Sequence, residues 1–106
     1  MKNNMSGGIQ QIMRQANQMQ TRMQKVQEEF AERQFEGSAG GGAVKVKVKN
    51  HMLLEVNIQD DLMKENDKEM LQDLIVSAAN DAIKTAKAQL QQEMDQVTGG
   101  IKLPGM

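Results

Sequence analysis

The chain has 106 residues, a formal net charge of −1, ten methionines, two phenylalanines and no cysteine, tryptophan or tyrosine. This length allows one small domain, which we expect to span residues 1–106, and the lack of cysteine excludes disulfide bonds and thiolate metal sites. No apolar stretch approaches the roughly 20 residues that span a bilayer, and the N-terminus lacks the apolar block of a secretory signal. We therefore expect a cytoplasmic protein with no membrane partner.

The small net charge conceals a separation of charge along the chain. Residues 1–27 contain four basic residues and no acidic residue, whereas residues 52–73 contain seven acidic and two basic residues. The whole protein is therefore not of the strongly basic class, but its first quarter is suited to a polyanion.

The first predicted element is a long helix over about residues 8–33, beginning after Gly7 and Gly8. Its apolar residues recur at alternating spacings of three and four, which is typical of the narrow seam of a helix that packs along another helix. At 1.5 Å per residue this helix is roughly 40 Å long, so part of it must project from the domain or pair with a second chain. The seam residues are Ile9, Ile12, Ala16, Met19, Met23, Val26 and Phe30.

Three strands are expected next, over about residues 34–39, 43–49 and 52–59, with a glycine turn at residues 40–42. Valine and lysine alternate along the middle strand, which predicts a sheet with one buried face and one polar face.

The loop between the second and third strands sets their register. A two-residue turn would pair Val46 with Glu55 and mix the two faces. A three-residue loop over residues 49–51 instead places Val46 opposite Leu54 and Lys45 opposite Glu55, so that like residues share a face. We predict the three-residue loop.

A short helical turn is expected at residues 60–64, followed by a second long helix over about residues 66–97. Asn66 is the expected N-cap, with Glu69 reaching back to complete a capping box. The broad apolar stripe of this helix has a period near 3.6, as in a helix that packs on a sheet.

Gly99 and Gly100 are expected to end this helix, leaving a tail over residues 98–106. The order of elements predicts an α+β protein of the type α-β-β-β-α.

Several segments taken together resemble the YbaB/EbfC family of nucleoid-associated proteins. No single segment is diagnostic, but in order they cover nearly the whole chain, and the combination is specific. The segments are MRQANQMQ at 13–20, MQKVQEE at 23–29, EGSAGGG at 36–42, VKV at 44–46, DKEMLQDLI at 67–75, NDA at 80–82, TGG at 98–100 and LPG at 103–105.

The resemblance implies a DNA-binding protein of bacterial type that forms a homodimer. It also implies a three-stranded antiparallel sheet packed by long helices that project like the arms of tweezers. A protein of this kind resides in the nucleoid and contributes to nucleoid organisation and gene regulation.

Enzyme signatures are absent from the sequence. No set of nucleophile, base and orienting group is present, so we expect no catalysis, no cofactor and no small-molecule substrate. His51 lies in a predicted turn without a second histidine nearby, so metal ligation is not expected there. The acidic residues of segment 60–69 lack the ligand spacing and glycine of a calcium loop.

The basic residues are the candidate contacts to double-stranded DNA. Arg14, Arg22 and Lys25 fall within an arc of about 80° on the first helix, roughly opposite the seam. A cationic row on a projecting helix can contact successive phosphates and release counterions, but phosphates carry little sequence information. We therefore predict duplex binding of low sequence specificity by the homodimer. Secondary candidates are Lys45, Lys47 and Lys49 on the polar sheet face, and Lys84 and Lys87 on the last helix, where Asp81 is expected to neutralise charge.

Two other functions remain open. A prefoldin-like holdase would use the soft methionine side chains to hold unfolded chains, and a coiled-coil adaptor would use the seam to recruit a partner. The broad stripe of the second long helix argues against one long antiparallel coiled coil. Salt-dependent binding to duplex DNA distinguishes the DNA-binding function from both alternatives.

Overall fold

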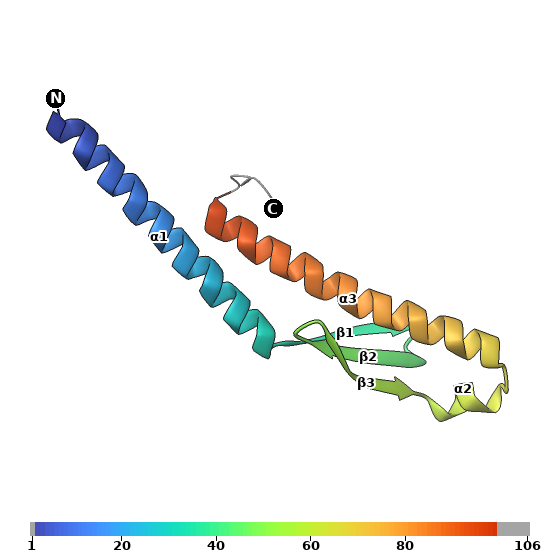
Figure 1. The fold of residues 1–106 in the computed structure, drawn as a ribbon. Helices are drawn as coiled ribbons and strands as arrows, with labels where there is room; N and C mark the ends of the chain where they lie inside the picture. Colours follow the sequence, from blue (N-terminus) through green and yellow to red (C-terminus); the bar gives the residue numbers. More distant parts are fainter. Residues whose placement is uncertain (1, 100–106) are drawn as a thin grey trace.

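The computed structural model describes the backbone of residues 2–99 and the side chains of residues 8–99, so most of the predicted tail lies outside the described residues. The elements follow the predicted order of helix, three strands and helix, with a short helix before the last one (Figure 1). The α+β fold class is confirmed. The elements are α1 (Lys2–Glu32), β1 (Gln34–Ala39), β2 (Val44–Lys49), β3 (Met52–Ile58), α2 (Asp60–Lys64) and α3 (Lys68–Thr98).

Helix α1 begins before the predicted position. It starts at Lys2 and passes through Gly7 and Gly8, which were expected to precede it. Glycine costs about 1 kcal/mol relative to alanine inside a helix, but it keeps its N–H donor and does not break the hydrogen-bond ladder as proline would. Two glycines therefore weaken this end of the helix without ending it.

The three strands form an antiparallel sheet in the order β1-β2-β3, and α3 packs on one of its faces. Val44, Val46 and Val48 point into this contact and are essentially inaccessible to solvent. The alternation of valine and lysine therefore predicted the buried face correctly. The core cluster consists of these valines with Phe30, Ala78, Ala82 and Ala86.

Small residues let α3 lie directly on β1. Gly37 is buried, and a Cβ atom at this position would overlap the backbone nitrogen of Ala82 and the carbonyl oxygen of Ala78. The sheet and the helix thus meet backbone to backbone at this point. Such close contact requires glycine on the strand and leaves room only for alanine on the helix.

The hairpin between β2 and β3 differs from the predicted one. Asn50 and His51 form a two-residue turn, both with a left-handed backbone at φ 49° and 64°, which is the turn geometry that suits the twist of paired strands. Lys49 therefore pairs with Met52. The predicted three-residue loop is wrong.

A β-bulge explains why the shorter turn does not mix the faces. The ladder is irregular between Lys47 and Val48, and Leu54 is the extra residue on β3. Beyond the bulge Val46 pairs with Val56 instead of the predicted Leu54. Apolar residues still share one face because the bulge absorbs one residue, a feature that alternation alone does not reveal.

The start of α3 also differs by one residue from the prediction. The N-cap is Asp67, whose Oδ1 accepts a hydrogen bond from the backbone N–H of Met70 at 3.0 Å. Asn66 has a φ of 53° and closes the turn after α2, with its backbone N–H donated to Met63. Asn66 is therefore not available as the cap, since a cap residue needs an extended backbone.

Helix α3 changes neighbours along its length. Its first half covers the sheet, and its second half extends beyond the sheet and lies beside α1 (Figure 1). Gly99 ends it with a φ of 64°, as the glycine pair predicted. The molecule is long and thin, with extents of 78 × 21 × 17 Å.

Candidate nucleic-acid interface

The N-terminal part of α1 is a free arm. Every described residue from Gly8 to Gln18 is exposed, and Figure 1 shows this part of the helix running past the end of α3. Among residues 8–99 the arm has no neighbour that would prevent contact with a large partner. We refer to residues 8–18 as the arm.

The predicted seam runs from the arm into the core. At its first positions Ile9 is 56% exposed, whereas Phe30 at the last position is only 2% exposed. Between these two positions the seam side chains become gradually less exposed, because only the second half of α1 lies against α3. Ile12 and Ala16 are exposed, and Met19, Met23 and Val26 are partly buried.

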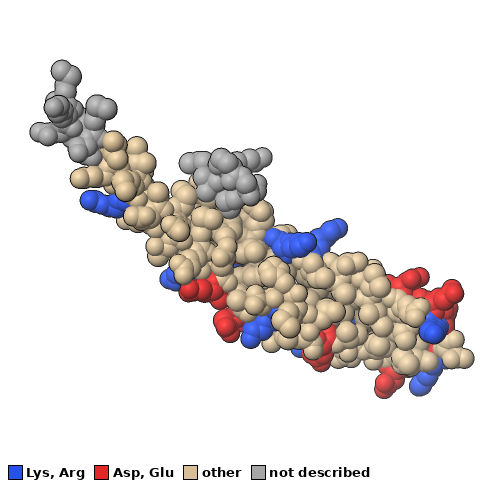
Figure 2. Space-filling model, in the orientation of Figure 1, with Lys and Arg blue, Asp and Glu red and all other residues tan. Residues whose placement is uncertain are grey.

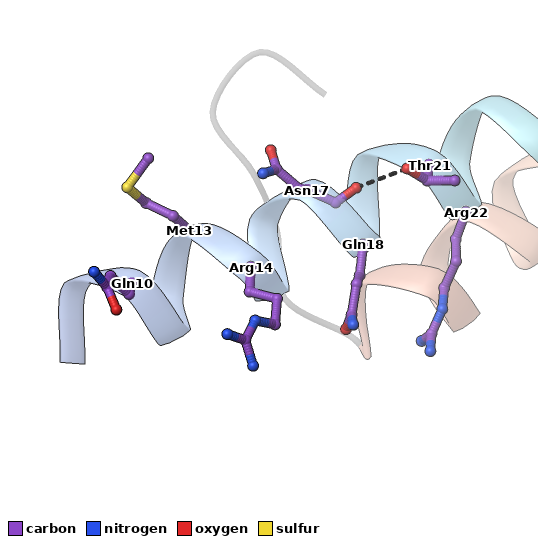
Figure 3. Close-up of a pocket in the computed structure, with 7 residues that line it drawn as sticks. All are labelled: Gln10, Met13, Arg14, Asn17, Gln18, Thr21 and Arg22. Atoms are coloured by element: carbon purple, nitrogen blue, oxygen red, sulfur yellow. Dashed lines mark hydrogen bonds between the residues drawn. The ribbon is translucent and has the colours of Figure 1, made fainter. Parts of the chain in front are cut away.

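The three principal basic candidates are all exposed on α1. Arg14 and Arg22 border a shallow hollow on one side of the helix, which Figure 3 shows in close-up, and Lys25 lies outside it. Within residues 8–99 none of these three side chains forms an ion pair. The hollow is lined by Gln10, Met13, Arg14, Asn17, Gln18, Thr21 and Arg22.

Two glutamines of this hollow were missed in the sequence analysis. Gln10, Arg14, Gln18 and Arg22 follow one another at intervals of four residues, so they lie along one side of the helix. Figure 3 shows Gln18 between the two arginines and pointing to the same side as them. The spacing is readable in the sequence, but it is obscured there by the many other glutamines of α1.

The sheet lysines are partly neutralised. Lys47 Nζ lies 3.6 Å from a carboxylate oxygen of Glu55, and Lys49 Nζ lies 3.6 Å from one of Glu32. The predicted pairing of Lys45 with Glu55 is wrong, because the bulge places Lys45 opposite Asn57. Lys45 and Lys47 are exposed on the uncovered sheet face, and Lys49 is partly buried. Lys47 and Lys49 each have an acidic neighbour.

Lys84 and Lys87 are exposed on α3. Asp81 was expected to neutralise them, but its carboxylate accepts a hydrogen bond from the backbone N–H of Ser38 at 3.0 Å. In Figure 2 basic groups over the middle of α3 lie on the upper edge of the molecule, whereas those of α1 lie on the lower edge. On the face shown in Figure 2 the two sets are separate.

Acidic side chains gather around α2 and the start of α3, at the end of the molecule away from the arm (Figure 2). Across the described part of the chain no group of three histidine, cysteine or acidic residues is placed to hold a metal ion. The basic arm and the acidic end therefore lie at opposite ends of the long axis.

One ion pair fixes the base of α1. Arg33, directly after the helix, donates a hydrogen bond to a carboxylate oxygen of Glu93 on α3 at 2.5 Å. This hydrogen bond lowers the pKa of Glu93 below its ordinary value, partial burial opposes the shift, and the amide of Gln89 adds to it. The pair links the end of α1 to the second half of α3.

Strand β3 leaves an apolar edge uncovered. Met52, Leu53 and Leu54 are each more than half exposed, and Val56 is 43% exposed. Helix α3 packs on β1 and β2 and leaves this strand open. The sequence predicted an apolar face for the strand but did not reveal that α3 stops short of it. No described helix is long and apolar enough to cross a membrane.

Comparisons with known proteins agree with the resemblance. Residues 5–101 match the YbaB/EbfC DNA-binding family. A nucleoid-associated protein of Clostridium novyi (strain NT) is 50% identical over 105 residues, which cover 96% of this chain and 92% of that protein. The fold is similar to the crystal structure of an uncharacterized protein from Helicobacter pylori, with a TM-score of 0.69 at 24% identity over 85% of this chain and 96% of that one.

Proposed function

Because the chain belongs to the YbaB/EbfC DNA-binding family, we propose that it binds duplex DNA as a homodimer, with low sequence specificity, through the exposed basic row of α1. In the cell this activity would place the protein in the nucleoid and contribute to nucleoid organisation and gene regulation. The observation that carries the proposal is the exposed basic row of α1, in which Arg14 lies on the arm and Arg22 and Lys25 follow it. No acidic residue precedes Glu28 on this helix.

The electrostatics favour α1 over the other basic groups. Arg14, Arg22 and Lys25 have no carboxylate partner within residues 8–99, so their charge is available to phosphates. Lys47 and Lys49 already lie beside carboxylates, and a lysine that must leave such a partner gains less from a phosphate. Lys47 and Lys49 are therefore secondary contacts.

A homodimer would cover apolar surface that one copy leaves exposed. Two candidate surfaces are present: the edge of β3, with Leu53 and Leu54, and the seam residues of the arm, with Ile9 and Ile12. Exposed strand edges readily pair with a second chain. Either arrangement doubles the number of basic rows, and two rows on one assembly raise its avidity for a duplex.

Sedimentation distinguishes the two surfaces. If the second copy docks on β3, Leu53→Lys shifts the protein towards monomer while Ile9→Ser does not. The reverse result assigns the dimer to the seam. A wild-type chain that stays monomeric at micromolar concentration contradicts the homodimer.

The DNA-binding proposal is tested by salt titration on duplexes of unrelated sequence. Wild-type affinity should fall steeply with salt, because each neutralised phosphate contributes about 0.9 to the slope of log K against log salt. Changing Arg14, Arg22 and Lys25 together to alanine should make this slope shallower by up to about 2.7 for each engaged arm.

The matched control removes the same number of charges from the sheet, at Lys45, Lys47 and Lys49. We expect it to change the slope by less than half as much. Equal slopes for both triple variants would contradict the assignment to α1. A holdase would instead suppress aggregation of unfolded clients with little salt dependence.

A further inference from the structure

Four residues on one side of α1, spaced four positions apart, alternate between amide and guanidinium side chains. We refer to these four residues as the ladder. Gln10, Arg14, Gln18 and Arg22 are all exposed, and each step along the helix is about 6 Å. Figure 3 shows Gln18 flanked by an arginine on each side. A pure phosphate-binding helix would not need an uncharged group at the centre of its cationic row.

The amides of these glutamines are free to bind a ligand. Within residues 8–99 neither Gln10 nor Gln18 has a side-chain hydrogen bond, whereas on α3 the amides of Gln89 and Gln91 donate to carboxylates four residues later, at 3.1 and 2.9 Å. The arm has no carboxylate that could do the same. Each ladder glutamine therefore keeps both a donor and an acceptor available.

The free arm also has the right dimensions for the major groove. A single α-helix fits this groove, which is about 12 Å wide. The sheet does not obstruct entry, since α1 runs past the end of α3 and the sheet lies at the other end of the helix. Glutamine in the major groove forms a bidentate pair with N6 and N7 of adenine.

We propose that the ladder enters the major groove, where Gln10 and Gln18 read adenine edges while Arg14 and Arg22 hold the flanking phosphates. This inference rests on the proposed DNA binding and adds a base-reading role to it. The two glutamines are about 12 Å apart along the helix, which corresponds to roughly three or four base pairs at 3.4 Å each. Two amides per arm give a weak preference for A·T pairs, consistent with low specificity.

The test is selection of bound duplexes from a randomised pool, followed by competition between the enriched duplex and a duplex lacking it. We expect wild-type protein to favour A·T at two positions about three to four base pairs apart, by about five- to tenfold per position. Gln18→Ala should lose the preference at one position. Because Gln18 carries no charge, the salt slope of this variant should match that of wild type.

Gln20→Ala is the matched control, because Gln20 is an exposed glutamine of the same helix that does not line the hollow. At 100° per residue its side chain points about 160° away from that of Gln18. This variant should keep the full wild-type preference.

The outcomes separate the inference from the proposed function. Salt-dependent binding without any base preference would overturn the base-reading role and leave DNA binding intact. The same holds if Gln18→Ala keeps the wild-type preference, or if the selected base is guanine and depends on Arg14. Absence of salt-dependent binding by the wild type would overturn both.

Discussion

Helices α1 and α3 have the same length of 31 residues, but they differ in how many of their side chains are buried. Among the described side chains of α1 only Phe30 is fully buried, whereas α3 buries five residues spread from Ala78 to Thr98. The difference follows from side-chain size and position. Alanines let α3 lie on the sheet along several turns, while α1 carries a narrow seam that meets α3 only in its second half. One helix therefore belongs to the core and the other extends from it.

The largest loss of stability is expected on changing Phe30, the residue that anchors α1 in the core. Phe30 packs its ring against Phe35 and His51, at centroid distances of 5.3 and 5.4 Å. Phe30→Ala should lower the free energy of unfolding by about 3–5 kcal/mol, since it leaves a cavity in the core. Urea denaturation measures this change. A loss below about 1 kcal/mol would show that α1 is not anchored at this position.

The close contact between α3 and the sheet should be disrupted by the addition of a single methyl group. Gly37→Ala places a Cβ atom against the backbone of Ala78 and Ala82, so the helix must move away. Overpacking of this kind costs about 1–3 kcal/mol, occasionally more. Thermal unfolding should show the loss. Ser38→Ala, one residue on and exposed, should change stability by less than about 0.5 kcal/mol.

The link between the two helices should depend on pH. Because Arg33 lowers the pKa of Glu93, the folded state favours the carboxylate more than the unfolded state does. The resulting stabilisation is complete above the ordinary value of 4.5 and is lost as pH falls through the lower folded pKa. Glu93→Gln should therefore lower stability at neutral pH by about 1–2 kcal/mol and flatten its dependence on pH below 4.5.

Denaturation of both proteins across this pH range measures that difference. Asp61→Asn is the control, since the pair of Asp61 with Lys64 is highly exposed at 3.7 Å. It should leave stability nearly unchanged at every pH. Parallel pH profiles for wild type and Glu93→Gln would contradict the role assigned to Glu93.

The smallest effect is expected at the free end of the seam. Ile9 and Phe30 occupy the same heptad position, three heptads apart, yet Ile9 is 56% exposed. Ile9→Ala should change the free energy of unfolding of dilute, monomeric protein by less than about 0.5 kcal/mol. A loss comparable to that of Phe30→Ala would show that the arm is packed along its whole length.

The comparison also shows what could be predicted from the sequence. Alternation at Val44, Val46 and Val48 predicted the buried sheet face because side-chain direction in a strand is set by covalent geometry. The pairing of Lys47 with Glu55 was missed because it depends on a bulge at Leu54. A bulge is a property of two strands together and leaves no mark on the hydrophobic pattern of either one.

Prediction of the candidate site was limited in the same way, because contacts between separate elements are not encoded in a local pattern. The heptad pattern correctly placed Arg14, Arg22 and Lys25 on an exposed face, since local periodicity determines the side of a helix. The exposure of Leu53 and Leu54 was not predictable, because it depends on where α3 rests across the width of the sheet. The same is true of Asp81, which has no pattern linking it to Ser38, 43 residues away.

The contact of Asp81 with Ser38 has a consequence for how many copies can join. A sheet with two open borders can add neighbours head to tail without limit and grow into a fibre. On the β1 border the carboxylate of Asp81 already occupies a backbone N–H that an incoming strand would need. This contact makes strand addition at the β1 border less favourable than at the open β3 border, so an edge-to-edge contact between two chains is favoured at β3 over continued growth.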